Sequence, residues 1–354
     1  MTQKDTFLSL VRLGIGLKSV NIPDSIDWLG IEALAVQQGL MAVVIDGIEK
    51  LPDEIRPPRE LLLQWIGIVM QEEQKFAIQQ KEASRMAQLF HHNYIRTYVL
   101  KGNIIAECYP NPAHRVSADM DCFLLPDNSD FDAWNLGNDL IKSKGFEVRT
   151  SFYKNSTFFL PGLMVENHKY LTPFRGNNKL KHLEIYLQGL LLDDDGVDRF
   201  DGTWLYRPPV MVSALFMIEH AYSHFLHEGL NWRFVADWVL FKIKHKNEID
   251  WFELSALIEE FGFKKFFDSF DRLGLYLLAD VSEDDLLIQD KRMIRDVWAN
   301  LDLHETTEGF KGKMNLVGNT LRARWKYHYF ADISMLHALC IQAKGVLIIR
   351  KPSL

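Results

Sequence analysis

The spacing of apolar residues changes near residue 94 and changes back near residue 179, which limits the folds open to this chain. Outside that stretch, apolar residues recur at every third or fourth position, as is typical of amphipathic helices. Inside it lie short β-branched and aromatic runs, including TYVL, DCFLLP and STFFLPGLMVE, the last with a turn at Pro161-Gly162. We therefore expect an α+β protein with a small mixed β-sheet core between two helical regions.

The same patterns divide the chain into three parts. We predict an N-terminal helical region over residues 1–93, an α/β core over 94–178 and a C-terminal helical domain over 179–354. Gly39 and Gly229 are expected to separate helices and Gly145 to end one, because glycine favours helix ends. Pro57-Pro58 is expected to open a long helix, since proline is tolerated in the first turn.

Composition narrows the class of protein. The 354 residues carry a formal net charge of -7, so nucleic acid is not expected as a partner. The three cysteines show no paired spacing, and no apolar run is long enough to span a bilayer. We expect a cytoplasmic protein without a membrane partner. The basic, aromatic run LRARWKYHYF is expected to form an amphipathic helix rather than a nucleic-acid site.

Two aspartates stand directly before an apolar run in SADMDCFLLP. If Asp119 and Asp121 begin a strand, both carboxylates point to one face, because side chains alternate along a strand. Carboxylates that close repel each other, and a divalent cation between them makes the arrangement favourable. Mg²⁺ takes oxygen ligands of this kind, and substrate phosphates often complete its shell. A solvated strand entry fits the same pattern, so D-x-D alone leaves both interpretations open.

Upstream of this pair, VLKGNIIAECYP runs from a predicted strand into a helix for which Asn103 is a candidate N-cap. Gly102 allows a close backbone approach to a ligand, and free N–H groups at a helix N-terminus bind phosphate. Lys101 and Arg115 add positive charge nearby. These residues favour a phosphate-binding turn, with an ordinary strand-to-helix turn as the alternative.

The stretch YVLKGNIIAECYPNPAHRVSADMDCFLL closely resembles the motif block of the uncharacterised nucleotidyltransferase family, within the polymerase β-like nucleotidyltransferase superfamily. The resemblance covers most of the chain. The matching positions are the turn glycine, the upstream arginine and the two metal-binding aspartates: Gly102, Arg115, Asp119 and Asp121. Ala118 replaces the glycine usual before the first aspartate, and Asn103 stands where serine or glycine is common. The resemblance implies a nucleotidyltransferase-type core.

The superfamily needs a third acidic residue on a neighbouring strand, and two glutamates are candidates. Glu166, in GLMVENHKY, follows an apolar run and stands at the end of a predicted strand. Glu184, in HLEIYL, lies inside a helical pattern of leucines and is expected to be a solvated helix residue. VENH also matches the family's pattern, so Glu166 is chosen, with His168 two residues later on the same face.

The resemblance implies metal-dependent nucleotidyl transfer. Asp119, Asp121 and Glu166 would hold Mg²⁺ or Mn²⁺, or Glu166 would accept a proton from the acceptor hydroxyl. The nucleoside triphosphate (NTP) would bind to residues around the turn and to one histidine: Lys101, Gly102, Asn103, Arg115 and His168. The nucleotidyl group would pass to an unidentified acceptor, either a small molecule or a protein side chain.

Two alternatives stay open. One is a non-catalytic nucleotide-binding or interaction protein that has kept the fold. The other is a phosphohydrolase with zinc or iron on His220, His224 and Asp237, because His220, His224 and His227 share one helix face. A partly buried, hydrogen-bonded histidine face fits the same spacing. The aromatic run NWRFVADW is expected to pack in the core.

Overall fold

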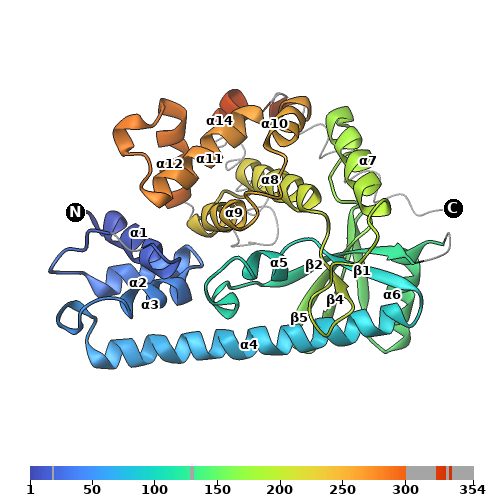
Figure 1. Cartoon of the computed structure of the whole chain (residues 1–354), viewed down its shortest axis with the longest axis horizontal. Helices are drawn as coiled ribbons and strands as arrows, with labels where there is room; N and C mark the ends of the chain where they lie inside the picture. Colours follow the sequence, from blue (N-terminus) through green and yellow to red (C-terminus); the bar gives the residue numbers. More distant parts are fainter. Residues whose placement is uncertain (18–19, 128–130, 300–323, 332–334, 337–354) are drawn as a thin grey trace, which may run out of the picture.

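The N-terminal helices lie at the left of the molecule, and one long helix runs beneath them along its base toward the sheet (Figure 1). The fold comes from a computed structural model that describes residues 1–17, 20–127, 131–299, 324–331 and 335–336. The elements here are α1 (Gln3–Gly14), α2 (Trp28–Gln37), α3 (Met41–Ile48), the 3-10 turn η1 (Asp53–Ile55) and α4 (Arg59–His91). Gly39 separates α2 from α3 with a φ of 66°, and Pro58 immediately precedes α4, as predicted.

A six-stranded mixed sheet forms the centre, in the order β3-β4-β5-β2-β1-β6. Its strands are β1 (Ile95–Val99), β2 (Asp119–Pro126), β3 (Val148–Phe152), β4 (Asn155–Leu160), β5 (Leu163–His168) and β6 (Leu205–Tyr206). The pairs β2–β5 and β1–β6 are parallel and the other pairs antiparallel. The expected α+β class with a mixed sheet is confirmed. The division at 94–178 stays a prediction, and the sheet takes β6 from beyond it.

The two faces of the sheet have different neighbours. On one face, α6 (Ala133–Ser143) packs so closely that a Cβ on Gly137 would meet Leu124 of β2 and Phe90 of α4. Toward the other face lies α8 (Val210–His227), with the ring of Phe216 5.9 Å from that of His168. The second face is therefore the one on which a cavity between sheet and helices can form.

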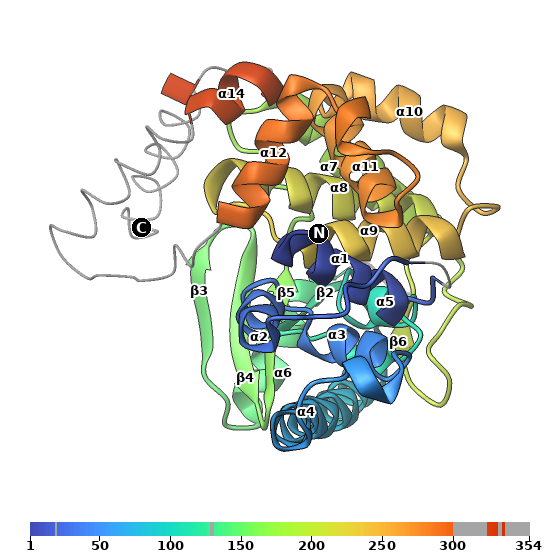
Figure 2. The ribbon, with the colours of Figure 1, turned by 90° about the vertical axis from the view of Figure 1, so that its left-hand side faces the viewer.

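The C-terminal helices form a layer above the sheet and above α1–α3 (Figures 1 and 2). Besides α8 they are α7 (Asn178–Leu192), α9 (Trp232–Lys244), α10 (Trp251–Glu260), α11 (Lys264–Leu278), the 3-10 turn η3 (Glu283–Asp285), α12 (Ile288–Ala299) and α14 (Arg324–Phe330). Trp232 and Trp238 of α9 are buried, which confirms the core packing predicted for NWRFVADW.

Side chains tie this layer to the N-terminal helices. Arg12 of α1 donates from Nε to the carbonyl oxygen of Leu277 (2.7 Å) and from Nη2 to that of Tyr276 (2.9 Å). Residues 300–323 and 337–354, which include the first three residues of LRARWKYHYF, lie outside the described residues. Across the part of the chain that is described, no helix is both long and apolar enough to cross a bilayer.

The turn between β1 and the following helix differs from expectation. The helix α5 (Asn103–Ala106) has only four residues, and the 3-10 turn η2 (Pro112–His114) follows it. The N-cap is Gly102, with φ 76° and ψ -98°, and the Asn103 side chain instead donates to Gln80 Oε1 at 3.0 Å. The prediction of Asn103 as N-cap was wrong, because a positive φ that favours glycine places the cap one residue earlier.

Candidate active site

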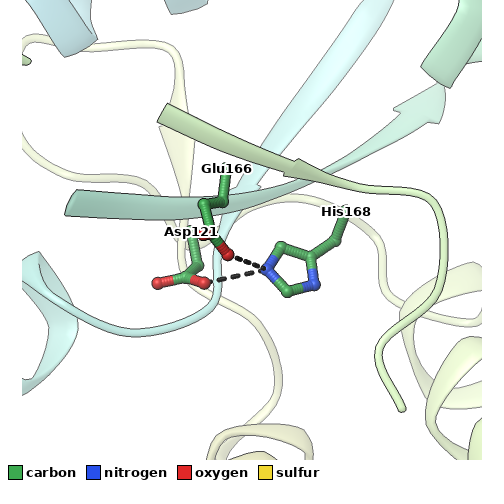
Figure 3. A group of neighbouring side chains, drawn as sticks. All are labelled: Asp121, Glu166 and His168. Atoms are coloured by element: carbon green, nitrogen blue, oxygen red, sulfur yellow. Dashed lines mark hydrogen bonds and ion pairs between the residues drawn. The ribbon is translucent and has the colours of Figure 1, made fainter. Parts of the chain in front are cut away.

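The pairing of β2 with β5 determines which acidic side chains meet. In their parallel register Asp121 lies beside Glu166, and Asp119 is two residues before Asp121 on the same face. Glu166 and His168 share a face of β5 for the same reason. Figure 3 shows the side chains of Asp121 and Glu166 converging on the ring of His168. The β2–β5 register thus brings the aspartates of β2 close to Glu166 and His168 of β5 on one face of the sheet.

His168 orients this cluster through hydrogen bonds. Its Nε2 donates to Oδ1 of Asp121 at 2.8 Å and lies 3.7 Å from Oε2 of Glu166. Oε2 of Glu166 also accepts from Nδ2 of Asn155 on β4, at 2.7 Å. One ligand atom each from Asp121, Glu166 and His168 lies within 4.8 Å of the others, a spacing that one metal ion can span.

Lys101 supplies the positive charge beside the carboxylates. Its Nζ lies 3.0 Å from Asp121 Oδ2, 4.0 Å from Asp119 Oδ2 and 3.1 Å from Nε2 of His220 on α8. Burial alone disfavours the ammonium, but the charges of Asp121 and Asp119 outweigh it and raise the pKa of Lys101. A charged Lys101 is therefore fixed between the sheet and α8.

The two facing carboxylates of β2 and β5 have opposite pKa shifts. Burial opposes ionisation of Asp121, but the Lys101 charge and the His168 hydrogen bond hold its pKa far below the usual range. The pKa of Glu166 is raised, first by burial and then by the charge of Asp121. Asp121 is thus a permanent anion, and Glu166 is the carboxylate of this pair that takes up a proton more readily.

The donor set fits a divalent metal ion. Asp121 Oδ2 is buried and pairs with the Lys101 ammonium at 3.0 Å, while Oδ1 accepts from His168. Carboxylate oxygens held in this way are hard ligands of the kind that a divalent cation takes. Asp119 lies on the same strand face and lines the adjoining cavity, as does Glu166. Asp121 and Glu166 belong to the group of side chains that could hold a metal ion, and Asp119 adds a further carboxylate two residues along the same strand face.

A cavity of about 570 Å³ extends from these carboxylates to the helical layer. That volume is in the range of sites for small ligands. The sheet side contributes Lys101, Asp119 and Glu166, and α8 and α9 contribute polar and aromatic groups: His220, His224, Glu228, Arg233, Phe234, Asp237 and Trp238. Ala118, at the cavity edge, is not among the described residues with positive φ, so alanine fits there without strain.

Arg115 is held by the helical layer rather than free in the cavity. Its Nε and Nη2 donate to the two carboxylate oxygens of Asp237 on α9, at 3.0 and 2.8 Å. The hydroxyl of Tyr109 donates to the same carboxylate at 2.8 Å. Arg115 is buried yet still lines the cavity. The pair fixes the loop before β2 to α9.

The alternative metal site on α8 is not formed in the described structure. Asp237 is engaged by Arg115, and Nε2 of His220 accepts from Lys101. His224 pairs through Nδ1 with Glu228 at 2.8 Å, while His227 donates to the carbonyl oxygen of Ser223. The group of ligand atoms found within the described chain contains none of these histidines. In the described structure these histidines and Asp237 are thus engaged with other partners rather than gathered around one point.

Glu184 is part of the structure's packing. It lies in α7, as its leucine pattern predicted, but it is buried rather than solvated, so that expectation was wrong. Its carboxylate accepts from the backbone N–H groups of Leu171 and Thr172 at 3.0 and 2.6 Å, and from Gln188 Nε2 at 2.6 Å. These donors come largely from the loop before α7, which the helical spacing of leucines does not reveal.

Arg233 and Glu228 also line the cavity, and the sequence did not single them out. Arg233 belongs to the aromatic run NWRFVADW, which drew attention only as core. The sequence does contain a pattern that could have indicated a role for Arg233. Arg233 and Asp237 are four residues apart and share one face of a helix rich in apolar residues. Charged residues at such positions need a partner or a ligand.

Fold and site together define an α+β protein with a carboxylate cluster beside a cavity that also presents cations. The model of the uncharacterised nucleotidyltransferase family matches residues 24–277, which is more than half of the chain. The chain belongs to this family, as the sequence motifs predicted. Comparison with curated proteins and with solved structures finds no match.

Proposed function

We propose that the protein transfers a nucleotidyl group from an NTP to an acceptor hydroxyl, with a divalent metal ion at Asp119, Asp121 and Glu166. The observation that carries this proposal is the β2–β5 register, which places Asp121 beside Glu166 at the cavity. Family membership adds the reaction class. Mg²⁺ is the favoured metal, with Mn²⁺ as a substitute, because the carboxylates offer hard oxygen ligands.

The residues of the chain have distinct parts in the proposed reaction. The acceptor oxygen attacks the α-phosphorus, its proton leaves, and pyrophosphate departs with the bond electrons. A bound divalent ion would neutralise charge on the phosphates. Glu166 would either complete the metal site or, as a carboxylate whose pKa is raised, receive the proton. His168 keeps the Asp121 carboxylate oriented through its 2.8 Å hydrogen bond.

The phosphates are expected near the turn after β1. Lys101 lines the cavity beside Asp119, and Gly102 follows it as the N-cap of α5. The four-residue α5 has only a small dipole, so side-chain cations carry more of the phosphate binding than its N-terminus. Asn103 acts indirectly, since its amide is engaged by Gln80. A cytoplasmic location agrees with a substrate of this kind and remains part of the proposal.

The test is transfer from α-labelled NTPs in the presence of Mg²⁺, with cell extract as the source of acceptor. Wild-type protein should label an acceptor, and the Asp119→Asn variant should not. Fractionating the extract into small molecules and proteins then identifies the acceptor class. Binding of NTP with no label transfer from any NTP would favour the non-catalytic binding alternative.

A further inference from the structure

Two arginines line the cavity beside the carboxylate cluster: Arg115, from the loop before β2, and Arg233, from α9. We propose that they form a phosphate subsite that binds the terminal phosphates of the nucleotide. The proposal rests on the proposed function and assigns a role to Arg233, which no sequence motif supplied. Arginine suits this role because its planar guanidinium donates in pairs to phosphate oxygens.

Arg115 is rigid and still has a donor to offer. Asp237 accepts from its Nε and Nη2, and the same carboxylate accepts from Tyr109. Nη1 of Arg115 is buried and has no acceptor in the described part of the chain. A buried donor without a partner is costly, so its persistence beside a cavity points to a ligand.

Arg233 repeats this arrangement from the helical side. Its Nη1 donates to the carbonyl oxygen of Val116 at 2.5 Å, while its Nε is buried without an acceptor among the described residues. Because Val116 directly follows Arg115, this hydrogen bond holds Arg233 against the loop that carries Arg115, and burial together with the charge of Arg115 lowers the pKa of Arg233. Arg115 is paired with Asp237, whereas the hydrogen bond of Arg233 within the described chain goes to a neutral carbonyl, so the charge of Arg233 remains available to an anion.

The arginines adjoin the end of the cavity where Asp119 lies. Asp119, Arg115 and Arg233 line the same cavity, and Arg233 is bonded to Val116, three residues before Asp119. A nucleotide with its α-phosphate beside Asp119 would extend its β- and γ-phosphates along this cavity toward the arginines. The subsite would stabilise the charge that develops on departing pyrophosphate.

The first experiment measures binding of inorganic tripolyphosphate by titration calorimetry in EDTA, so that no divalent ion contributes. Arg233→Gln should weaken binding at least tenfold. Lys244→Gln is the matched control: it removes one positive charge from the same helix, but Lys244 is more exposed and does not line the cavity. The control should stay within twofold of wild type.

Arg233→Lys tests whether a loss of binding reflects misfolding, because this variant keeps the positive charge and loses only the paired donors of the guanidinium. It should bind tripolyphosphate between wild type and Arg233→Gln, with an unchanged thermal unfolding midpoint. Wild-type affinity in Arg233→Gln would overturn the subsite. Equal losses in Arg233→Gln and Lys244→Gln would also overturn it, since they would reflect net charge alone.

The second experiment identifies which phosphates bind there. With Mg²⁺ present, Arg233→Gln should weaken binding of an NTP at least tenfold and that of the corresponding monophosphate less than twofold. Equal weakening of both would overturn the assignment to the terminal phosphates. Asp119→Asn should keep tripolyphosphate binding in EDTA. This result would support the phosphate subsite even if the protein transferred no nucleotidyl group. The subsite and the proposed nucleotidyl transfer are therefore tested independently.

Discussion

Nζ of Lys101 lies 3.0 Å from Oδ2 of Asp121, and the two side chains form an ion pair at the end of the cavity. The Asp121 side chain is 2% exposed and that of Lys101 15% exposed. Two buried charges stabilise each other, because either charge buried alone would have an uncompensated desolvation free energy. Removing Asp121 therefore disturbs folding as well as any metal site.

The two aspartates of β2 are expected to respond differently to substitution by asparagine. Asp119→Asn should abolish Mg²⁺-dependent NTP binding with little loss of stability, because the Asp119 side chain is 22% exposed and lies 4.0 Å from Lys101. Asp121→Asn should abolish binding and also lower the free energy of unfolding by about 3 kcal/mol, since it strips Lys101 of its close partner. Calorimetric titration with each of the four NTPs, together with urea unfolding, measures both effects. Unchanged NTP binding in both variants would count against the proposed metal site.

The two candidate glutamates should separate metal binding from stability. Glu166→Gln should weaken Mg²⁺ affinity at least tenfold while the fold persists, because the amide can still accept from Asn155. Glu184→Gln should leave Mg²⁺ affinity unchanged and destabilise the protein by about 2 kcal/mol, since Glu184 accepts several buried hydrogen bonds. Mg²⁺ titration and thermal unfolding of both variants provide the comparison. The opposite pattern would make Glu184 the third carboxylate.

The Arg115–Asp237 pair should contribute strongly to the docking of the loop before β2 on α9. Asp237→Asn is expected to lower the free energy of unfolding by about 3 kcal/mol, because the buried guanidinium loses its counterion. Asp284→Asn, an exposed position in η3, is the control and should change it by less than about 0.5 kcal/mol. In a double-mutant cycle with Arg115→Met, the combined loss should be smaller than the sum. Additive losses would show that the two side chains do not interact.

His114 should make stability depend on pH. It bonds through Nδ1 to Asp46 of α3 at 2.7 Å and through Nε2 to Glu73 of α4 at 3.0 Å. Burial alone lowers the pKa of His114, but these two hydrogen bonds outweigh it and raise the pKa above that of an unfolded histidine. Its contribution is therefore complete below the unfolded pKa of about 6.5 and is lost as pH rises through the folded value.

The corresponding experiment compares His114→Gln with wild type by urea unfolding at pH 6 and pH 9. The substitution should cost about 2 kcal/mol at the lower pH and clearly less at the higher one. His182→Gln, at an exposed position of α7, is the control and should change the free energy of unfolding by less than about 0.5 kcal/mol. A loss for His114→Gln that is equal at both pH values would mean that the folded protein does not bind this proton more tightly.

Local patterns in the sequence predicted much of the fold. Alternation along β2 put Asp119 and Asp121 on one face, and the turn at Pro161-Gly162 joins β4 to β5 as expected. Features that depend on contacts between residues far apart in the sequence could not be predicted from local patterns. The two-residue β6 is recognisable only from its pairing with β1, and the parallel approach of β5 to β2 depends on the packing of the whole sheet.

The candidate site shows the same limit. D-x-D and VENH supplied the residues, but nothing local shows that Lys101 reaches His220 on α8, 119 positions later. Asn103 was misassigned because the backbone of Gly102 decides where α5 begins. The sequence did not predict Arg233 as a site residue, because the aromatic residues around it in α9 indicated core packing. The roles of these residues in catalysis stay predictions that the variants above address.

The 33-residue α4 joins two packing surfaces on one continuous helix. Near its start, Trp65 packs against Trp28 of α2, and near its end Phe90 is buried beside the sheet. One residue inserted between them would turn one surface by about 100° relative to the other and lengthen the helix by about 1.5 Å. The length of α4 therefore fixes the orientation of the N-terminal helices relative to the sheet. Insertions or deletions in α4 should be far less tolerated than those in the loops that flank it.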